Sequence, residues 1–321
     1  MAISFRLLVR LSLLLVMLLV LVGGVVRSSG SGMGCPDWPM CFGRIIPPVS
    51  VSELPVNYQE IYAHRGYDTM EFNAVKTWIE YLNRLLGVVV GIAVLAMAAA
   101  AFRFRKQAPL HWKLSASALF LTVLQGGIGA IVVMMHLEPW VVTVHMVLAL
   151  LLVMILAALF QLTHKVEAIH LGLAPTKRLI FWTTLLFSLT GFQILMGTRV
   201  RQAVDIVAEL LSDLPRVEWI AHLEPLLSLH KFLGLLVFLI ALRWLYLVRP
   251  MVSAHASLTR LLYSVLLLIG LEIGVGTVLV LYGLPTWAQP LHLVMAFAII
   301  LKLVRFMVCF RQSIIISESH G

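Results

Sequence analysis

Three histidines within apolar segments are the residues of this chain best placed to bind a metal. At a rise of 1.5 Å per residue, His145, His230 and His292 each lie about five residues inside a predicted membrane span, so their depths match. Ionisable side chains inside spans are rare and usually functional, although a lone histidine can also simply bond a neighbouring helix. Two opposed imidazoles hold heme iron between the helices of a bundle. His230 and His292 therefore predict a bis-histidine heme site.

The chain repeats itself at an offset of 147 positions, and this repeat relates the histidines to one another. His145 aligns with His292, but His230 aligns with Asn83, and an amide is a poor iron ligand. An open iron position suits oxygen chemistry, whereas two strong axial ligands suit electron transfer. The sequence thus predicts one reactive site and one electron-passing or structural site.

Glu80 lies one turn before Asn83 and is the candidate catalytic residue of the reactive site. A desolvated carboxylate beside a substrate can give or take a proton. The alternative is an ion pair with Arg84 at the i,i+4 spacing.

The composition shows which elements must position these groups. The chain is 61% hydrophobic and 12% charged, with a mean hydropathy of +0.98, which excludes a soluble enzyme or a disordered protein. Apolar runs predict an all-α integral membrane protein with eight transmembrane helices, near 7–26, 78–101, 114–135, 140–163, 179–200, 225–248, 259–282 and 287–309.

The repeat predicts that these helices form two pseudo-symmetric four-helix bundles. We expect residues 1–165 to form the first bundle, with a large outer loop at about 27–77, and residues 166–321 to form the second. The net charge of +9 is concentrated in alternate loops, which predicts that both termini are cytoplasmic and gives no indication of nucleic-acid binding.

The outer loop carries Cys35 and Cys41, which face the oxidising side in this topology. They predict a disulfide that either staples the loop or passes electrons. A set of basic residues near the helix ends is predicted to neutralise heme propionates or to reach the membrane interface: Arg27, Arg84, Arg199, Arg201 and Lys231.

Taken together, these motifs resemble the heme A synthase family. The markers are Gly23-Gly24-Val25-Val26-Arg27, the segment Cys35-Pro-Asp-Trp-Pro-Met-Cys41, Glu80-Tyr-Leu-Asn83-Arg84, Val144-His145-Met-Val-Leu-Ala149, Gly197-Thr-Arg-Val-Arg201, and the histidines His230 and His292.

The resemblance implies an enzyme that oxidises the C8 methyl of heme O to a formyl group, giving heme A for terminal oxidases. It implies a heme b between His230 and His292, substrate heme at His145, and catalysis by Glu80. The family commonly has histidine where this chain has Asn83. The loop residue His64 is the alternative second ligand, and the other expectation is that His145 acts alone.

Other functions stay open at this stage. A di-heme b-type cytochrome would need six-coordinate iron in both halves, and a heme-handling assembly or transport protein would need midplane sites. The expected setting is the bacterial inner membrane, with heme O, its lipid surroundings and heme O synthase as partners. The sequence leaves the electron donor and the oligomeric state open.

Overall fold

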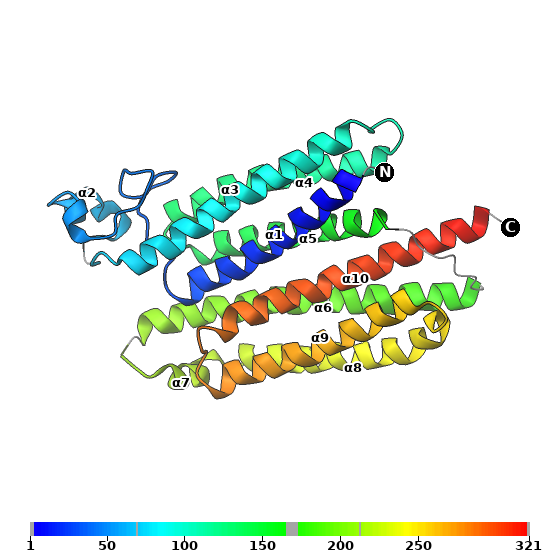
Figure 1. Ribbon diagram of the computed structural model, residues 1–321. Helices are drawn as coiled ribbons and strands as arrows, with labels where there is room; N and C mark the ends of the chain where they lie inside the picture. The colour runs from blue at the N-terminus through cyan, green and yellow to red at the C-terminus, as the bar shows by residue number, and fades with distance from the viewer. Residues whose placement is uncertain (1–2, 69, 165–172, 212, 320–321) are drawn as a thin grey trace. The chain divides into compact units, whose positions relative to one another are not determined.

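The computed structural model describes residues 3–68, 70–164, 173–211 and 213–319 (Figure 1). Within this part of the chain the regular elements are helices, accompanied by one isolated bridge between Cys41 and Arg44. The long helices are α1 (Ile3–Ser28), α3 (Ala74–Phe102), α4 (Pro109–Met134), α5 (Pro139–Leu162), α6 (Leu173–Leu210), α8 (Leu226–Val252), α9 (Ala256–Leu281) and α10 (Ala288–Ser319).

Each of these eight described helices contains a stretch long and apolar enough to cross a membrane. The predicted all-α fold with eight spans is therefore confirmed. Local signals explain several of the helix starts. The Asn73 side chain accepts a hydrogen bond from the Lys76 backbone N–H and caps α3, while Pro109 and Pro139 open α4 and α5, where a missing N–H costs nothing.

The helix predicted at 179–200 is too short, because α6 continues to Leu210. The last turns of α6 are amphipathic rather than uniformly apolar, so hydropathy alone ends the helix too early. Val204 and Val207 on these turns are buried against Trp219 and Leu223. These two partners belong to the short helices α7 (Arg216–Trp219) and η3 (Ile220–Leu223).

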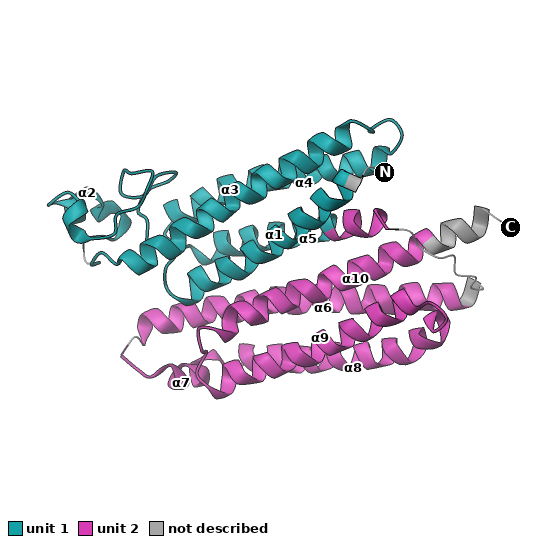
Figure 2. Ribbon diagram, in the orientation of Figure 1, with its two compact units in different colours: residues 1–156 teal, residues 157–321 magenta. Residues whose placement is uncertain are grey.

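The chain divides into two compact units, residues 1–156 and 157–321 (Figure 2). In unit 1, α1 packs on α3 and α3 packs on α4. In unit 2, helices α6, α8, α9 and α10 pack in sequence, and α10 returns to α6, which closes a four-helix bundle. The domain boundary predicted between residues 165 and 166 lies outside the described residues, and pseudo-symmetry between two bundles stays a prediction.

The core of unit 2 is built around a buried tryptophan. Trp244 is fully buried, and its indole N–H donates to Thr183 Oγ1 at 2.9 Å. Its ring meets Phe306 edge to face at 5.1 Å. Burying the ring and satisfying its single donor together anchor α8 against α6 and α10.

The segment between α1 and α3 has a small core of its own, and Figure 1 shows it at the end of unit 1 where α3 begins. It contains η1 (Val51–Glu53), α2 (Tyr58–Ile61) and η2 (Ala63–Arg65). Phe42 lies at its centre, with edge-to-face contacts to four rings, those of Tyr58, Tyr62, Tyr67 and Phe72. This aromatic cluster gives the loop a defined structure outside the spans.

Candidate functional site

The two histidines of unit 2 face each other. His230 and His292 occupy the fifth positions of α8 and α10, and their ring centres are 6.5 Å apart with an angle of 73° between the ring planes. Two metal–nitrogen bonds of about 2 Å each, plus the half-widths of two imidazoles, sum to roughly this separation. The pair can hold one metal atom between the rings.

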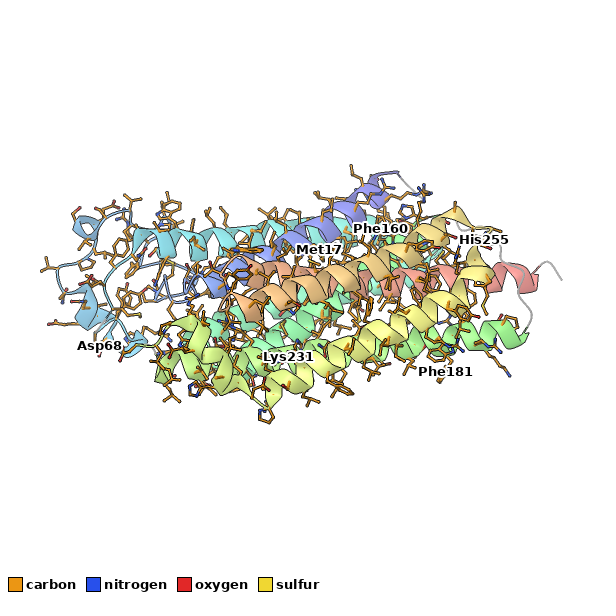
Figure 3. All side chains as sticks on the ribbon, turned by 90° about the horizontal axis from the view of Figure 1, so that it is seen from below. Met17, Asp68, Phe160, Phe181, Lys231 and His255 are labelled. Carbon is orange, nitrogen blue, oxygen red and sulfur yellow. A yellow bond between two sulfur atoms is a disulfide. The ribbon has the colours of Figure 1, made fainter. Side chains whose placement is uncertain are left out.

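Each ring in unit 2 lies against a glycine of a neighbouring helix. A Cβ added at Gly197 of α6 would be 3.3 Å from His230 Cε1, and one at Gly276 of α9 would be 3.3 Å from His292 Cε1. Larger residues would press on the rings, so the glycines make room for them. Figure 3 shows all described side chains and labels Lys231, which follows His230 in α8.

The neighbouring polar side chains also contact these two histidines. The Gln193 side-chain amide donates to the His230 backbone carbonyl at 2.9 Å. A carboxylate oxygen of Glu272 lies 3.1 Å from His292 Nδ1. Neither Glu272 nor Gln193 was among the candidate residues predicted from the sequence. An acidic residue inside a span was the signal that identifies Glu272.

Unit 1 presents a related arrangement with a different residue. His145 on α5 lies against Gly129 of α4, where an added Cβ would be 3.7 Å from His145 Cε1. Asn83 on α3 faces Gly23 of α1, where an added Cβ would be 3.9 Å from Asn83 Oδ1. The Gln125 amide donates to the His145 carbonyl at 3.0 Å.

Several polar atoms of these residues are buried and have no hydrogen-bond partner among the described residues. They are Nδ1 of His145, Nδ1 of His230, Nδ1 of His292 and Oδ1 of Asn83; the Glu272 oxygen near His292 Nδ1 is within reach but makes no hydrogen bond to it in this structure. Buried polar groups in proteins are nearly always hydrogen-bonded, so such atoms call for a ligand or solvent. Together with the glycine-lined rings, they fit a flat metal-bearing cofactor at the histidines.

Glu80 is almost completely buried and is bonded through both carboxylate oxygens. Oε2 accepts the Cys35 backbone N–H at 2.9 Å, and Oε1 accepts Arg84 Nη2 at 2.5 Å. The ion pair considered as the alternative for Glu80 therefore exists. Since i and i+3 share a helix face, Glu80 still lies one turn from Asn83 on α3. Its catalytic role stays a prediction.

Arg84 also holds the outer loop. Its guanidinium donates to the backbone carbonyls of Asp37 at 2.7 Å, Met40 at 3.0 Å and Cys35 at 3.3 Å. The 35–41 segment therefore curves around the guanidinium, and most of the hydrogen bonds that Arg84 donates in this structure go to carbonyls of this segment. Its predicted role toward a propionate is untested.

The predicted disulfide between Cys35 and Cys41 is present, and both residues are completely buried. The Asp37 carboxylate organises the same turn by accepting the backbone N–H groups of Phe42 at 2.6 Å and Gly43 at 2.7 Å. Sequence reasoning did not identify this role of Asp37, although an aspartate in a short turn is a common signal of backbone bonding.

Tyr67 connects the loop to the segment after α1. Its hydroxyl donates to the Met33 carbonyl at 2.5 Å. Burial, followed by the negative charges of Glu80 and Asp37, raises the pKa of Tyr67 well above its ordinary value of 10.0. The phenol therefore keeps its donor proton across the physiological range.

Two of the basic residues predicted to bind heme propionates form ion pairs with acidic side chains in this structure. Arg201 pairs with Asp205 at 2.8 Å and donates to Gln289 Oε1 at 2.5 Å. Lys231 pairs with Glu224 at 3.3 Å. Arg27 lies in the last turn of α1, and Arg199 is an exposed residue of α6. The proposed propionate contacts of all four are untested.

His64 lies in η2 and is exposed. The next residue, Arg65, donates to the Met134 carbonyl at the end of α4 with a 2.8 Å bond. This bond ties the histidine-bearing turn to the end of α4. Whether His64 acts as a ligand remains a prediction.

Comparison with known proteins identifies relatives along the whole chain. A family profile described as Cytochrome oxidase assembly protein (COX15-CtaA) matches residues 6–304. The heme A synthase of Shewanella oneidensis is 31% identical over 156 residues, covering 49% of this chain and 44% of the relative. The chain thus spans less than half the length of that relative.

Two further heme A synthases align over most of their length. The Methylorubrum populi protein is 28% identical over 317 residues, covering 89% of this chain and 81% of the relative. The Ehrlichia canis protein is 28% identical over 321 residues, covering 88% of this chain and 86% of the relative. Because the family profile extends from residue 6 to residue 304, the chain belongs to the COX15-CtaA family of cytochrome oxidase assembly proteins.

Proposed function

We propose that this protein is a heme A synthase, a membrane oxidoreductase that converts the C8 methyl group of heme O to the formyl group of heme A. The conversion consists of two successive hydroxylations of one carbon, followed by loss of water from the geminal diol. In each hydroxylation one atom of dioxygen enters the carbon, and the other is reduced to water by two electrons and two protons from an external donor. The named activity of three relatives supports the proposal. The observation that carries it is the facing pair of His230 and His292, with the different pair of His145 and Asn83 at the repeat-equivalent positions.

In this proposal unit 2 holds a resident heme b. His230 and His292 would hold its iron, because their separation admits one iron atom and their rings lie against glycines. When bound, a bis-histidine heme supplies reversible one-electron chemistry. The chain's own contribution is to hold both imidazoles in place and to surround them with packed helices.

Unit 1 receives heme O as substrate in this proposal. His145 is the helix-borne ligand, and Asn83 leaves the opposite side without an imidazole from α3. Glu80, one turn away and nearly enclosed, gives or takes protons at its carboxylate oxygens near the reacting methyl group. Basic residues such as Arg27 orient the propionates through charge-assisted bonds.

The proposed setting is the bacterial inner membrane, with both termini in the cytoplasm. An excess of basic residues in the corresponding loops supports this orientation. Heme O synthase is the proposed source of the substrate, and lipid surrounds the helices.

The test is to purify the protein, extract its hemes and identify them by chromatography and mass. We expect heme B together with heme O or heme A, and conversion of heme O to heme A when heme O synthase is co-expressed. His230→Ala and His292→Ala should each remove the low-spin signal and reduce heme B. Absence of heme would reject the proposal, and full heme B in both variants would reject the ligand assignment.

A further inference from the structure

Glu272 is an acidic residue of unit 2 for which the proposed function gives no role. It lies on α9 with its side chain 15% exposed, and its Oε1 lies 3.1 Å from His292 Nδ1. A carboxylate inside a span is costly and is retained where it contacts a functional group. Here the group it contacts is the imidazole that faces His230.

The equivalent position of unit 1 shows what is special about Glu272. Gln125 stands there, and its amide donates to the His145 backbone carbonyl at 3.0 Å. In unit 2 the Gln193 amide similarly donates to the His230 carbonyl. Glu272 has a carboxyl group where Gln125 has an amide. Its oxygen lies at the ring nitrogen of His292 instead.

A carboxylate at Nδ1 determines which nitrogen of His292 is available to a metal. If Nδ1 carries the proton and points to Glu272, Nε2 is the nitrogen with a free lone pair. Gly276, one turn further along α9, lies against Cε1 of the same ring, so α9 contacts the imidazole at two adjacent points. Carboxylates behind metal-bound histidines fix ring orientation and strengthen the ligand.

We propose that Glu272 is a positioning residue that, when heme is bound, accepts the Nδ1–H of His292 across the present 3.1 Å separation, directs Nε2 toward the heme, and lowers the heme's reduction potential. This inference rests on the proposed function, because it requires His230 and His292 to ligate the heme of unit 2. The repeat-equivalent residue Gln125 has an amide in place of the carboxyl group, so the two halves differ in the side chain beside the ligand as well as in the ligand set.

The test is the Glu272→Gln variant of the full-length protein, which keeps the side-chain shape and introduces the residue found in unit 1. We expect heme B to bind, but with an affinity reduced about 10-fold to 100-fold. We also expect a higher midpoint potential in a redox titration. The electron paramagnetic resonance g-values should shift, because they depend on the angle between the imidazole planes.

Glu272→Asp and Thr277→Ala complete the design. Glu272→Asp retains the carboxylate on a shorter side chain, so its midpoint potential should lie between those of Glu272→Gln and the parent protein. It serves as the second test if Glu272→Gln does not fold. Thr277 is an exposed residue of α9 whose hydroxyl bonds within its own helix, so Thr277→Ala should change none of the three properties.

The outcomes separate this inference from the proposed function. Unchanged affinity, potential and g-values in the Glu272 variants would overturn the inference, while loss of heme B in His292→Ala would still support the ligand assignment. Full heme B in both His230→Ala and His292→Ala would instead overturn the ligand assignment and the role of Glu272 with it.

Discussion

At the scale of single residues, the two halves of the chain differ at positions that matter for metal chemistry. His230 is replaced by Asn83, and Glu272 by Gln125, while His292 and His145 are retained. The first difference concerns a ligand and the second concerns the group behind a ligand. In the proposed function, both differences favour bis-histidine binding in unit 2 and an open site in unit 1.

The open site in unit 1 can be tested by restoring the missing imidazole. Asn83→His should convert bound substrate heme toward a low-spin, bis-histidine form, because two strong ligands then face the iron. His145→Ala should abolish heme A formation, and Glu80→Gln should reduce turnover more than heme binding. Optical spectra and heme analysis measure these effects.

His64 provides the control for this prediction. In the open-site hypothesis, His64→Ala leaves the spectrum of unit 1 unchanged. If His64→Ala removes a low-spin signal from unit 1, the outer loop supplies the second ligand and the open-site hypothesis is wrong.

The raised pKa of Tyr67 predicts a pH dependence of the loop. Its folded pKa lies above the unfolded value, so the stability that it contributes is complete below pH 10 and is lost as pH rises through the folded value. Ultraviolet titration curves of the parent protein and of Tyr67→Phe should differ by the absorbance change of one phenol that ionises above the ordinary tyrosine pKa. A difference centred on the ordinary tyrosine range would contradict this assignment.

At the scale of elements, the outer loop is attached to α3 through backbone groups as well as side chains. Gly34 lies directly on the first turn of α3, where an added Cβ would be 2.6 Å from the Lys76 carbonyl oxygen. Thr77 Oγ1 donates to the Gly34 carbonyl at 2.8 Å, and Arg84 binds the carbonyls of the 35–41 segment. The loop and the start of α3 therefore form one structural element.

Arg84→Ala should loosen this element strongly. It leaves the buried Glu80 carboxylate without its cation, and breaking a buried pair in this way costs about 3–5 kcal/mol. Limited proteolysis of the outer loop should accelerate, while Arg84→Lys should retain part of the protection. Equal cleavage rates in Arg84→Ala and the parent protein would show that Arg84 does not hold the loop.

The burial of Cys35 and Cys41 favours a structural disulfide over an electron-passing one. Thiol–disulfide exchange requires a thiolate to reach a sulfur atom, and both cysteines are 0% exposed. We expect the disulfide to resist mild reductant in the folded protein and to become reducible after denaturation, as measured by alkylation and mass spectrometry. Rapid reduction in the native state would instead favour a redox role.

At the scale of the whole molecule, the distribution of charge predicts the topology. Basic residues favour the cytoplasmic side of a membrane, so reporters fused to either terminus should be active in the cytoplasm. A periplasmic reporter placed in the outer loop, near residue 56, should be active on the opposite side. Activity of a terminal fusion outside the cytoplasm would contradict the predicted orientation.

The sequence alone determined the eight helices and the position of each histidine within the first two turns of its helix, because these follow from local properties. Apolar length is sufficient to identify a span, and the position of a residue along a helix sets its depth. The repeat also identified Asn83 as the position lacking a histidine. Where a helix is amphipathic, as at the end of α6, hydropathy underestimates its length.

The tertiary structure decided which groups contact one another. Arg84 binds carbonyls of the outer loop, and Glu272 lies at the ring of His292, through contacts between residues that are distant in the chain. A span that is apolar all round gives little indication of its rotation, and a shift of one residue moves a side chain by about 100° around the axis. The identity of the candidate residues was thus readable from the sequence, whereas their partners depended on how the helices pack.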